Sequence, residues 1–298
     1  MDVPPRSERP APRESILTKV TPSRQAITLF GDYWWGNREP VPTGALLAAL
    51  GDMGVKEAAA RATLSQLVRN ELLVSERVGR RTTHQLTERG AQQIAEEVAW
   101  LETFGRIEPR WDGLWSVVAF SVPETRRAAR HSARSRLKWL GFAPLYDGVW
   151  ISPTDAAKEA MEQLRSVDID DVTIMRARLD RSLPEGPQAA WDPGATRRLY
   201  EQFTAEVGSC PGLRGAAALA ARSRVMLMWQ RFRTLDVGLP LELLPTQWPR
   251  SAARQRFVHC FNGLGPAAEE RMREHVAAIS PELSSLVCER RLTPSTEG

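Results

Sequence analysis

The sequence predicts a multidomain α+β protein with an N-terminal winged helix-turn-helix, a central ferredoxin-like β-α-β-β-α-β domain and a C-terminal all-helical domain. Three observations lead to this fold class. The chain has 298 residues, whereas a typical domain has about 100–200. Helical periodicity encloses a basic hairpin in the first part, and strand-like runs alternate with helical ones in the second. Only helical patterns follow the Pro/Gly-rich linker that begins the third part.

The expected boundaries follow these changes of pattern. Residues 1–20 are rich in Pro, Arg, Ser and Glu, which predicts a disordered tail. The expected domains are a winged helix over 21–105, a ferredoxin-like domain over 106–182 and a helical domain over 189–280, followed by a tail over 281–298.

The composition is that of a globular protein, with 42% hydrophobic and 26% charged residues. No apolar run approaches the roughly 18–20 residues that cross a bilayer, and the N-terminus lacks the apolar segment of a secretory signal. We therefore expect a cytoplasmic protein without a membrane partner. The net charge is only +4, but 36 of the 40 basic residues are Arg, a residue that suits phosphate and guanine contacts. A bias toward GC-rich codons would give the same ratio, so the position of each Arg matters more.

The first periodic block has the element order of a winged helix. Apolar side chains recur at helical spacing after Ser23, the expected N-cap, and Thr43 is the expected cap of a second, short helix. A third helix is expected from about Val55 to Asn70. The remaining elements are two strands that form a hairpin and a closing helix, over residues 72–77, 82–86 and 88–104.

The third helix carries a polar stripe opposite its apolar face. Glu57, Arg61 and Ser65 are spaced four residues apart and share one side, with Lys56 and Arg69 beside them. A recognition helix needs this arrangement, because one face is anchored in a core while the other enters a major groove. The alternative interpretation is an ordinary solvated helix face.

Arg80 and Arg81 stand at the tip of the hairpin, where they would meet phosphates or the minor groove. Residues 55–90 hold seven Lys or Arg and four Asp or Glu, so a net charge of +3 does not by itself establish DNA binding. The residues predicted to contact double-stranded DNA are Lys56, Arg61, Ser65, Arg69, Arg80 and Arg81.

The middle block reads as strand, helix, strand, strand, helix, strand, which is the ferredoxin-like order. It opens with the continuous apolar run from Leu114 to Val122, typical of a buried strand. The later elements are expected over 124–140, 142–146, 148–151, 155–164 and 172–179. The helix over 124–140 is strongly basic, with Arg126, Arg127, Arg130, Arg134, Arg136 and Lys138. In the third block, helices are expected from Asp192 or Thr196, over 213–232, over 250–261 and over 266–279, the last two separated by a turn.

No catalytic site, metal site or cofactor is expected. The histidines are scattered, and neither a CxxC pair nor a Gly-rich phosphate loop occurs. A nuclease of ferredoxin-like fold would need carboxylates at the end of the first strand to hold Mg²⁺. That position holds Phe120-Ser121-Val122-Pro123, and Asp112 lies at the opposite end. An enzyme is therefore not expected, and a nuclease is the weakest alternative.

Several segments in order resemble the PaaX-type family, the repressors of phenylacetic acid degradation. The resemblance covers roughly residues 23–280 and rests on the ordered set rather than on one piece. The matching segments are 28–32, Arg61 with Leu64-Ser65, 78–81, 86–90, 111–113, 139–142, 148–153, 238–240, 243–245 and 248–249.

This resemblance implies the three domains given above and a homodimer that acts in transcription regulation. It implies repression of catabolic genes and release from operator DNA by an aryl-acyl-CoA effector, such as phenylacetyl-CoA. Arg61, Ser65, Arg80 and Arg81 occupy positions that match the family. Gln66 follows Ser65 where relatives often carry Arg, so the operator of this chain is expected to differ.

Two points stay open at the level of the sequence. The winged helix could bind a protein instead of DNA, without a small-molecule effector. A CoA thioester would need Arg beside an apolar pocket. Two segments meet that description, and the sequence does not choose between them, so the effector-binding residues are unknown. The segments are the basic helix over 124–140 and the run with Arg222, Arg224, Arg231 and Arg233 beside Met226, Met228 and Trp229.

Overall fold

The computed structural model describes residues 20–79, 81–179, 186–208 and 212–294, so the tail expected over 1–20 lies almost wholly outside the described residues. The chain forms two compact units. The first is built from residues up to Glu102, from Gln202–Arg231 and from Gln255–Pro294. The second is built from Thr103–Glu201 and Phe232–Arg254.

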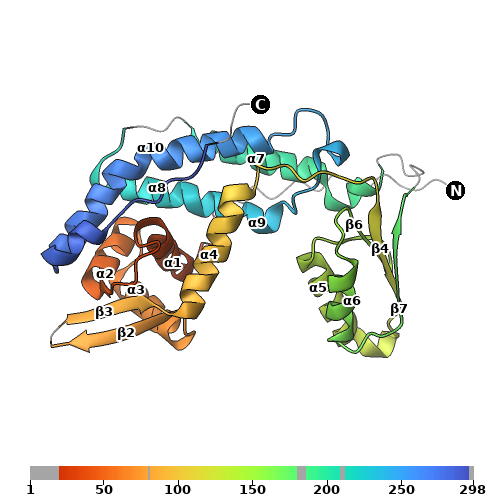
Figure 1. Ribbon diagram of the computed structural model, residues 1–298, viewed down its shortest axis with the longest axis horizontal. Coiled ribbons are helices and arrows are strands. Elements are labelled where there is room, and N and C mark those ends of the chain that lie inside the picture. Colours follow the sequence, from red (N-terminus) through yellow and green to blue (C-terminus); the bar gives the residue numbers. More distant parts are fainter. Residues whose placement is uncertain (1–19, 80, 180–185, 209–211, 295–298) are drawn as a thin grey trace. The chain divides into compact units, whose positions relative to one another are not determined.

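The first unit contains the winged-helix arrangement predicted for the N-terminal part (Figure 1). Three strands form one antiparallel sheet in the order β1-β3-β2. Its elements are α1 (Pro22–Tyr33), β1 (Val41–Pro42), α2 (Thr43–Asp52), α3 (Glu57–Arg69), β2 (Leu73–Val78), β3 (Arg81–Leu86) and α4 (Glu88–Thr103). The strand β1 is too short to show a sequence pattern, and it was not expected.

Both expected helix caps were wrong by one or two residues. The N-cap of α1 is Thr21, whose hydroxyl oxygen accepts the N–H of Arg24 at 3.3 Å. Pro22 then occupies the first helical position, where its missing N–H costs nothing. Thr43 is the first residue of α2 rather than its cap, and its hydroxyl donates instead to the carbonyl oxygen of Thr82 at 2.7 Å. A tertiary partner has therefore replaced the local one.

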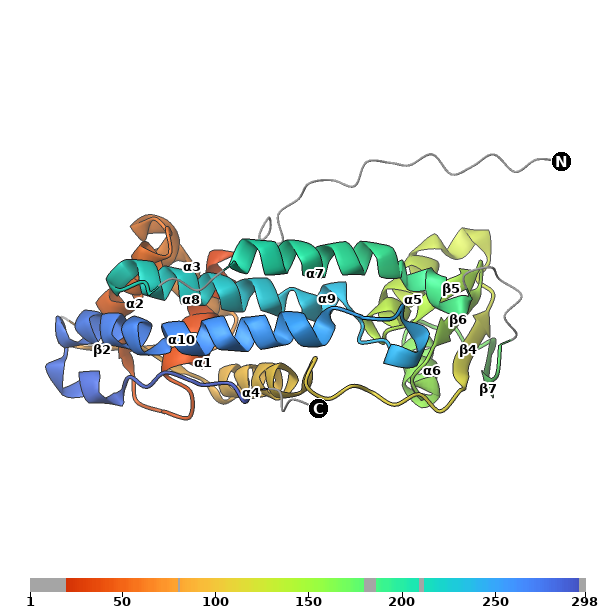
Figure 2. The ribbon, with the colours of Figure 1, turned by 90° about the horizontal axis from the view of Figure 1, so that it is seen from above.

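The C-terminal helices are α7 (Pro193–Val207), α8 (Gly215–Gln230), α9 (Phe232–Leu235) and α10 (Arg250–Ala277), and a 3₁₀ turn follows over Pro281–Leu286. Of these, α8 and α10 contribute side chains to the core of the winged helix, whereas α9 belongs to the second unit. Within the first unit, α8 packs against α1 and α2. Leu219 of α8 and Met272 of α10 lie in one hydrophobic cluster with Phe30 and Leu64. The long helices α8 and α10 run side by side (Figure 2), and their rings Trp229 and Phe257 stack with centroids 4.9 Å apart.

The turn expected between two helices near residue 263 is absent, because α10 continues through it. Pro266 lies inside this 28-residue helix. Proline removes one intrahelical hydrogen bond and crowds the preceding turn. The helix nonetheless buries Phe261 and Leu264 before the proline and Ala268 and Met272 after it. Burial on both sides offsets the local cost.

The segment after α10, expected only as a polar tail, is packed in the first unit. Val287 is fully buried and Leu292 nearly so. Arg290 donates its backbone N–H to the carbonyl oxygen of Asp32 at 2.8 Å, and its guanidinium lies 2.7 Å from the Asp32 carboxylate. The end of α1 is therefore fixed by residues more than 250 positions away.

The second unit contains the ferredoxin-like domain, as predicted. Its four-stranded antiparallel sheet has the order β5-β6-β4-β7, and α5 and α6 cover one face (Figure 1). The elements are β4 (Trp115–Phe120), α5 (Arg127–Trp139), β5 (Ala143–Tyr146), β6 (Val149–Ser152), α6 (Ala157–Arg165) and β7 (Val172–Ala177), with 3₁₀ turns over Glu124–Arg126, Pro187–Trp191 and Leu241–Leu243. The other face carries Trp115, Val117 and Ile151, which pack with Leu243. No helix among the described residues is long and apolar enough to cross a membrane.

Candidate nucleic-acid interface

The helix α3 is anchored on one side and open on the other. Its buried residues are Ala60, Thr63, Leu64 and Leu67, and the helix packs against α1 and α2. The four predicted contact residues of this helix and its N-terminal flank are all exposed, namely Lys56, Arg61, Ser65 and Arg69. The structure thus presents them together on the solvent side, as a helix that enters a major groove requires.

Arg61 is ion-paired along its own helix. Its Nη2 and Nε lie 2.8 Å and 3.0 Å from Oε1 of Glu57, one turn earlier. Both side chains are more than half exposed, at 60% and 68%. An exposed pair of this spacing contributes only about 0.3–0.5 kcal/mol. The guanidinium can therefore exchange Glu57 for the two acceptors of a guanine edge without a large cost.

A second set of side-chain hydrogen bonds lies at the C-terminal end of α3. Arg69 donates to Oε1 of Gln66 at 2.5 Å, and the Gln66 amide donates to Oδ1 of Asn70 at 2.8 Å. Gln66 is exposed and directly follows Ser65. An amide that both donates and accepts can read adenine in the major groove. The predicted contact set did not include Gln66, although the departure of this position from the family resemblance was the available signal.

Small side chains complete the exposed face of α3, and sequence reasoning did not single them out. Ala58, Ala59 and Ala62 are exposed even though alanine is commonly buried. Because alanine side chains are short, they allow a helix to lie close to the floor of a DNA major groove, and a methyl group can contact the methyl of thymine. Exposed alanines between polar residues were the signal for this feature.

The hairpin of β2 and β3 presents basic groups beside the helix. Arg81 is exposed and opens β3 opposite Val78, and Gly79 adopts a φ of +63° in the turn. Arg77, a further exposed cation that sequence reasoning did not include, donates from Nε to the Gly79 carbonyl oxygen at 3.2 Å. Arg80 lies outside the described residues.

Buried contacts hold the base of the hairpin in place. His84 of β3 is buried, and its Nδ1 lies 3.0 Å from the Thr43 hydroxyl of α2. Burial lowers the pKa of His84, which favours the neutral ring at neutral pH. At the start of α4, a Cβ added to Gly90 would overlap the carbonyl oxygen of Leu72, so only glycine fits there. The hairpin is therefore set firmly relative to α2 and α4.

Arg222, the first residue of one of the two segments considered for an effector, has a structural role. Arg222 is fully buried and donates to the carbonyl oxygens of Phe261 and Arg290 at 3.1 Å and 2.6 Å. Its guanidinium also lies 3.8 Å from the centroid of the Phe261 ring. Because it is fully buried and two of its nitrogens donate to backbone carbonyl oxygens, Arg222 is not placed to receive a phosphate.

The second unit holds a cavity of about 780 Å³ against the sheet face that α5 and α6 leave open. Trp111 and Trp115 form part of its wall, with ring centroids 5.5 Å apart in an edge-to-face arrangement. Trp111 donates its indole N–H to the Leu114 carbonyl oxygen at 3.0 Å, so its ring is held and its donor is used. Leu243 and Pro245 add apolar wall, and Glu242 is the charged group of the lining. Such a cavity suits an uncharged aromatic group better than an anion.

The carboxylate Asp112, weighed for a nuclease, is engaged in local structure. It accepts the N–H of Leu114 at 2.9 Å and pairs with the guanidinium of Arg176 in β7. These contacts lower the pKa of Asp112 below its ordinary value, the backbone hydrogen bond being the larger cause. Within the described ranges, no cluster of three His, Cys, Asp or Glu side chains could hold a metal ion.

Comparison with protein families finds three consecutive matches. Residues 23–90 match the model described as PaaX-like protein, residues 108–190 match the PaaX protein central Cas2-like domain, and residues 191–274 match the PaaX-like protein C-terminal domain. Among curated proteins, the chain is 25% identical over 255 residues to the transcriptional repressor PaaX of Escherichia coli (strain K12), covering 81% of this chain and 79% of that one.

Among solved structures, the chain resembles the uncharacterized protein Rv0674 from Mycobacterium tuberculosis. The TM-score is 0.50 with 22% sequence identity, over 78% of this chain and 89% of that one. At this identity the likeness concerns the fold alone, and it extends across all three sequence regions.

Proposed function

The chain belongs to the PaaX-like family of transcriptional repressors, and from this premise we propose that it represses transcription by binding a double-stranded operator through α3 and the β2–β3 hairpin. The observation that carries the proposal is the exposed polar face of α3. Arg61, Ser65 and Gln66 project from a helix whose opposite side is locked into a core. This face reads base edges, and Lys56 and Arg69 hold phosphates at its two ends.

The hairpin serves affinity rather than sequence preference. Arg77 and Arg81 lie on paired strands at its outer end, where flexible cations meet the phosphate backbone. Arg80, which lies between them in the sequence, has the same role in this proposal. Contacts of this kind bind every sequence and are weakened by salt.

The operator is proposed to be a pseudo-palindrome bound by a homodimer. A single winged helix reads only a short half-site, and a two-fold pair of copies doubles the set of contacts. Light scattering at micromolar concentration measures this directly, and a strictly monomeric mass would contradict it.

The regulated genes are proposed to be those of aromatic-acid catabolism of the phenylacetate type, with an aryl-acyl-CoA as the releasing effector. Family membership supports this, and so does the cavity of the second unit, where Trp111 and Trp115 offer aromatic wall to an aryl group. Its volume of about 780 Å³ is in the range of small-molecule sites, which is roughly 300–1,000 Å³. A hundredfold loss of DNA affinity on effector binding needs about 2.7 kcal/mol of coupling.

Fluorescence anisotropy with a labelled duplex from the DNA flanking the protein's own gene tests the proposal. We expect nanomolar binding that unlabelled random duplex does not abolish, and release by phenylacetyl-CoA but not by free CoA or phenylacetate. Failure to bind any flanking duplex would favour the alternative, a winged helix that binds protein. If the protein binds DNA but aryl thioesters up to about 1 mM do not release it, the proposal of a repressor stands and the proposal of an aryl-acyl-CoA effector is rejected.

A further inference from the structure

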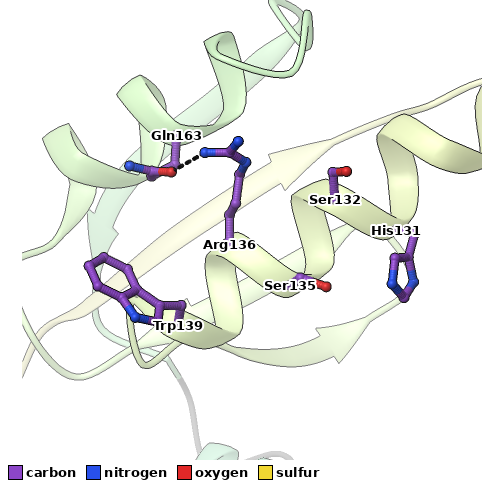
Figure 3. Close-up of a pocket in the computed structure, with 6 residues that line it drawn as sticks. All are labelled: His131, Ser132, Ser135, Arg136, Trp139 and Gln163. Carbon is purple, nitrogen blue, oxygen red and sulfur yellow. Dashed lines mark hydrogen bonds between the residues drawn. The ribbon is translucent and has the colours of Figure 1, made fainter. Parts of the chain in front are cut away.

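A groove on the helical face of the second unit is unrelated to the predicted DNA contacts. It lies over α5 and α6, has a volume of about 510 Å³, and its lining is shown in Figure 3. Five lining residues come from α5 and one from α6. They are His131, Ser132, Ser135, Arg136, Trp139 and Gln163. The groove thus lies on the strongly basic helix that the sequence singled out and that the proposed function does not use.

Helical spacing arranges these side chains in two adjacent rows. His131, Ser135 and Trp139 are four residues apart, as are Ser132 and Arg136. The first row therefore spans about 12 Å at 1.5 Å per residue. Figure 3 shows Trp139 at one end of the groove and His131 at the other.

Trp139 gives the groove an aromatic platform. Its side chain is 81% exposed, the highest value among the large hydrophobic residues described. The other exposed aromatic rings, Trp35 and Tyr146, reach 41% and 60%. An indole left in water at the edge of a groove is a surface on which a planar ring can stack.

Arg136 gives the groove a positioned cation. Its Nη1 donates to Oε1 of Gln163 on α6 at 2.6 Å, which holds the half-buried guanidinium across the groove. Ser132, Ser135 and His131 add groups able to donate hydrogen bonds, and no residue of the lining is a carboxylate. Glu159 and Glu162 of α6 lie outside the lining.

Two other arginines of α5 are paired with carboxylates. Arg130 pairs with Glu124 at 3.1 Å, and Arg134 pairs with Asp147 at 2.7 Å. Arg136 differs from both because its partner is a neutral amide, so its full positive charge is left for an anion. A phosphate is one of the anions whose geometry matches a planar guanidinium, and adjacent hydroxyl groups can donate to its remaining oxygens.

We propose that this groove binds a phosphorylated nucleotide group, with the base stacked on Trp139 and the phosphate held by Arg136 and the adjacent serine hydroxyls. The two anchors are three residues apart, about 4.5 Å along the helix, so they are neighbours on the surface of α5. The group can come from a soluble metabolite such as a CoA derivative or from a nucleic-acid strand. The proposed site does not depend on whether an acyl-CoA is the effector of this protein.

Isothermal titration calorimetry with the full chain tests the site in the absence of operator DNA. The probes are adenosine 3′,5′-bisphosphate, CoA, a single-stranded oligonucleotide and inorganic phosphate. We expect the bisphosphate to bind one site per chain, and phosphate alone to bind far more weakly because it cannot stack. Trp139→Ala should weaken binding about tenfold or more, the usual effect of losing a stacking partner, and Trp139→Phe should keep most of it.

Matched control variants distinguish binding in the groove from the general effects of losing a positive charge or an exposed indole. Arg136→Gln removes the cation of the groove, whereas Arg165→Ala removes an exposed cation of α6 outside the lining, and Trp35→Ala removes an exposed indole of the first unit. Only Arg136→Gln and the Trp139 variants should weaken binding. Tighter binding of CoA than of the oligonucleotide assigns the site to a metabolite, and the reverse assigns it to a nucleic acid.

Three outcomes overturn the proposal. They are the absence of binding by every nucleotide probe, equal losses in the groove and control variants, and a change of oligomeric mass in Trp139→Ala without any nucleotide binding. The last would make Trp139 a contact between protein chains. None of these outcomes affects the operator experiment, since α3 and the hairpin are unchanged.

Discussion

Arg61 of α3 and Arg250 of α10 are both ion-paired arginines in opposite surroundings. Arg61 is 60% exposed and meets one carboxylate, Glu57, on its own helix. Arg250 is 1% exposed and meets Asp236 at 3.0 Å and Glu108 at 2.6 Å, and it also donates to the Leu239 carbonyl oxygen. The first pair is easily exchanged for a ligand, whereas the second holds the fold. In an Arg-rich chain the same side chain can therefore serve a structural role at one position and, at another, the DNA-reading role proposed for Arg61.

The charge of Arg250 survives burial because of its partners. Burial opposes the charged form, but the Asp236 carboxylate outweighs it and raises the pKa of Arg250 above its ordinary value. Tyr200 adds a hydrogen bond of 2.6 Å to the same carboxylate, and burial together with that negative charge raises the pKa of the tyrosine. The cluster is a closed network in which each buried polar group depends on the others.

The largest effect is expected for Arg250→Ala. Removing one member of a buried pair leaves Asp236 charged and unpaired, which costs about 3–5 kcal/mol of unfolding free energy. Urea unfolding of the full chain measures it, with Arg134→Ala as the control. Arg134 pairs with Asp147 at the surface, so its loss should cost less than about 1 kcal/mol. Equal losses in the two variants would show that burial does not separate the two kinds of arginine.

Next in size is the expected effect of Arg61→Ala, which should fall on DNA affinity and leave stability unchanged. Losing a bidentate base contact costs about 1–3 kcal/mol and relaxes sequence preference at one position. Arg291→Ala is the matched control, because Arg291 is 63% exposed and pairs with Glu289 at 3.3 Å in the same unit. Anisotropy titrations with operator and random duplex measure both quantities. If Arg61→Ala bound like the control, α3 would not be the reading helix.

A smaller and different effect is expected for Arg81→Ala at the hairpin. A lost phosphate contact should weaken operator and random duplex alike and reduce the slope of log K against log salt by about 0.9. Titrations at several salt concentrations measure that slope. A loss confined to the operator would instead place Arg81 in a groove, reading bases.

The elements of the fold were largely predictable, whereas the partners of individual side chains were not. Periodicity gave α3, the hairpin and the β-α-β-β-α-β order because amphipathic faces are local patterns. It could not show that Arg222 is buried, since the carbonyl oxygens that accept from it belong to Phe261 and Arg290, far along the chain. For the same reason the segment around Arg290 read as a polar tail. The cap at Thr21 was a local miss, because Pro22 marks the first helical position.

The candidate site likewise has features that the sequence predicts and features that it does not. The exposed positions of α3 followed from the spacing of its apolar face, so the exposure of Arg61, Ser65 and Arg69 was predictable. The four-residue spacing of Glu57 and Arg61 also permits their ion pair. The spacing alone does not show whether a ligand would displace Glu57 from Arg61. The groove at Trp139 was hidden, because an aromatic residue after a basic helix usually reads as core.

The smallest effect, and the sharpest test of the exchangeable pair, is expected for Glu57→Gln. Loss of the carboxylate frees Arg61 and should tighten operator binding about twofold, the equivalent of an exposed ion pair. The same change should lower stability by a few tenths of a kcal/mol, since Glu57 also stands at the positive N-terminus of α3. Affinity and stability should thus move in opposite directions. Glu88→Gln removes another exposed carboxylate from the same unit, 85% exposed against 68% for Glu57, and controls for the general change in charge. In the Arg61→Ala background the gain from Glu57→Gln should vanish, and a gain that persisted there would mean that Glu57 repels DNA directly instead of restraining Arg61.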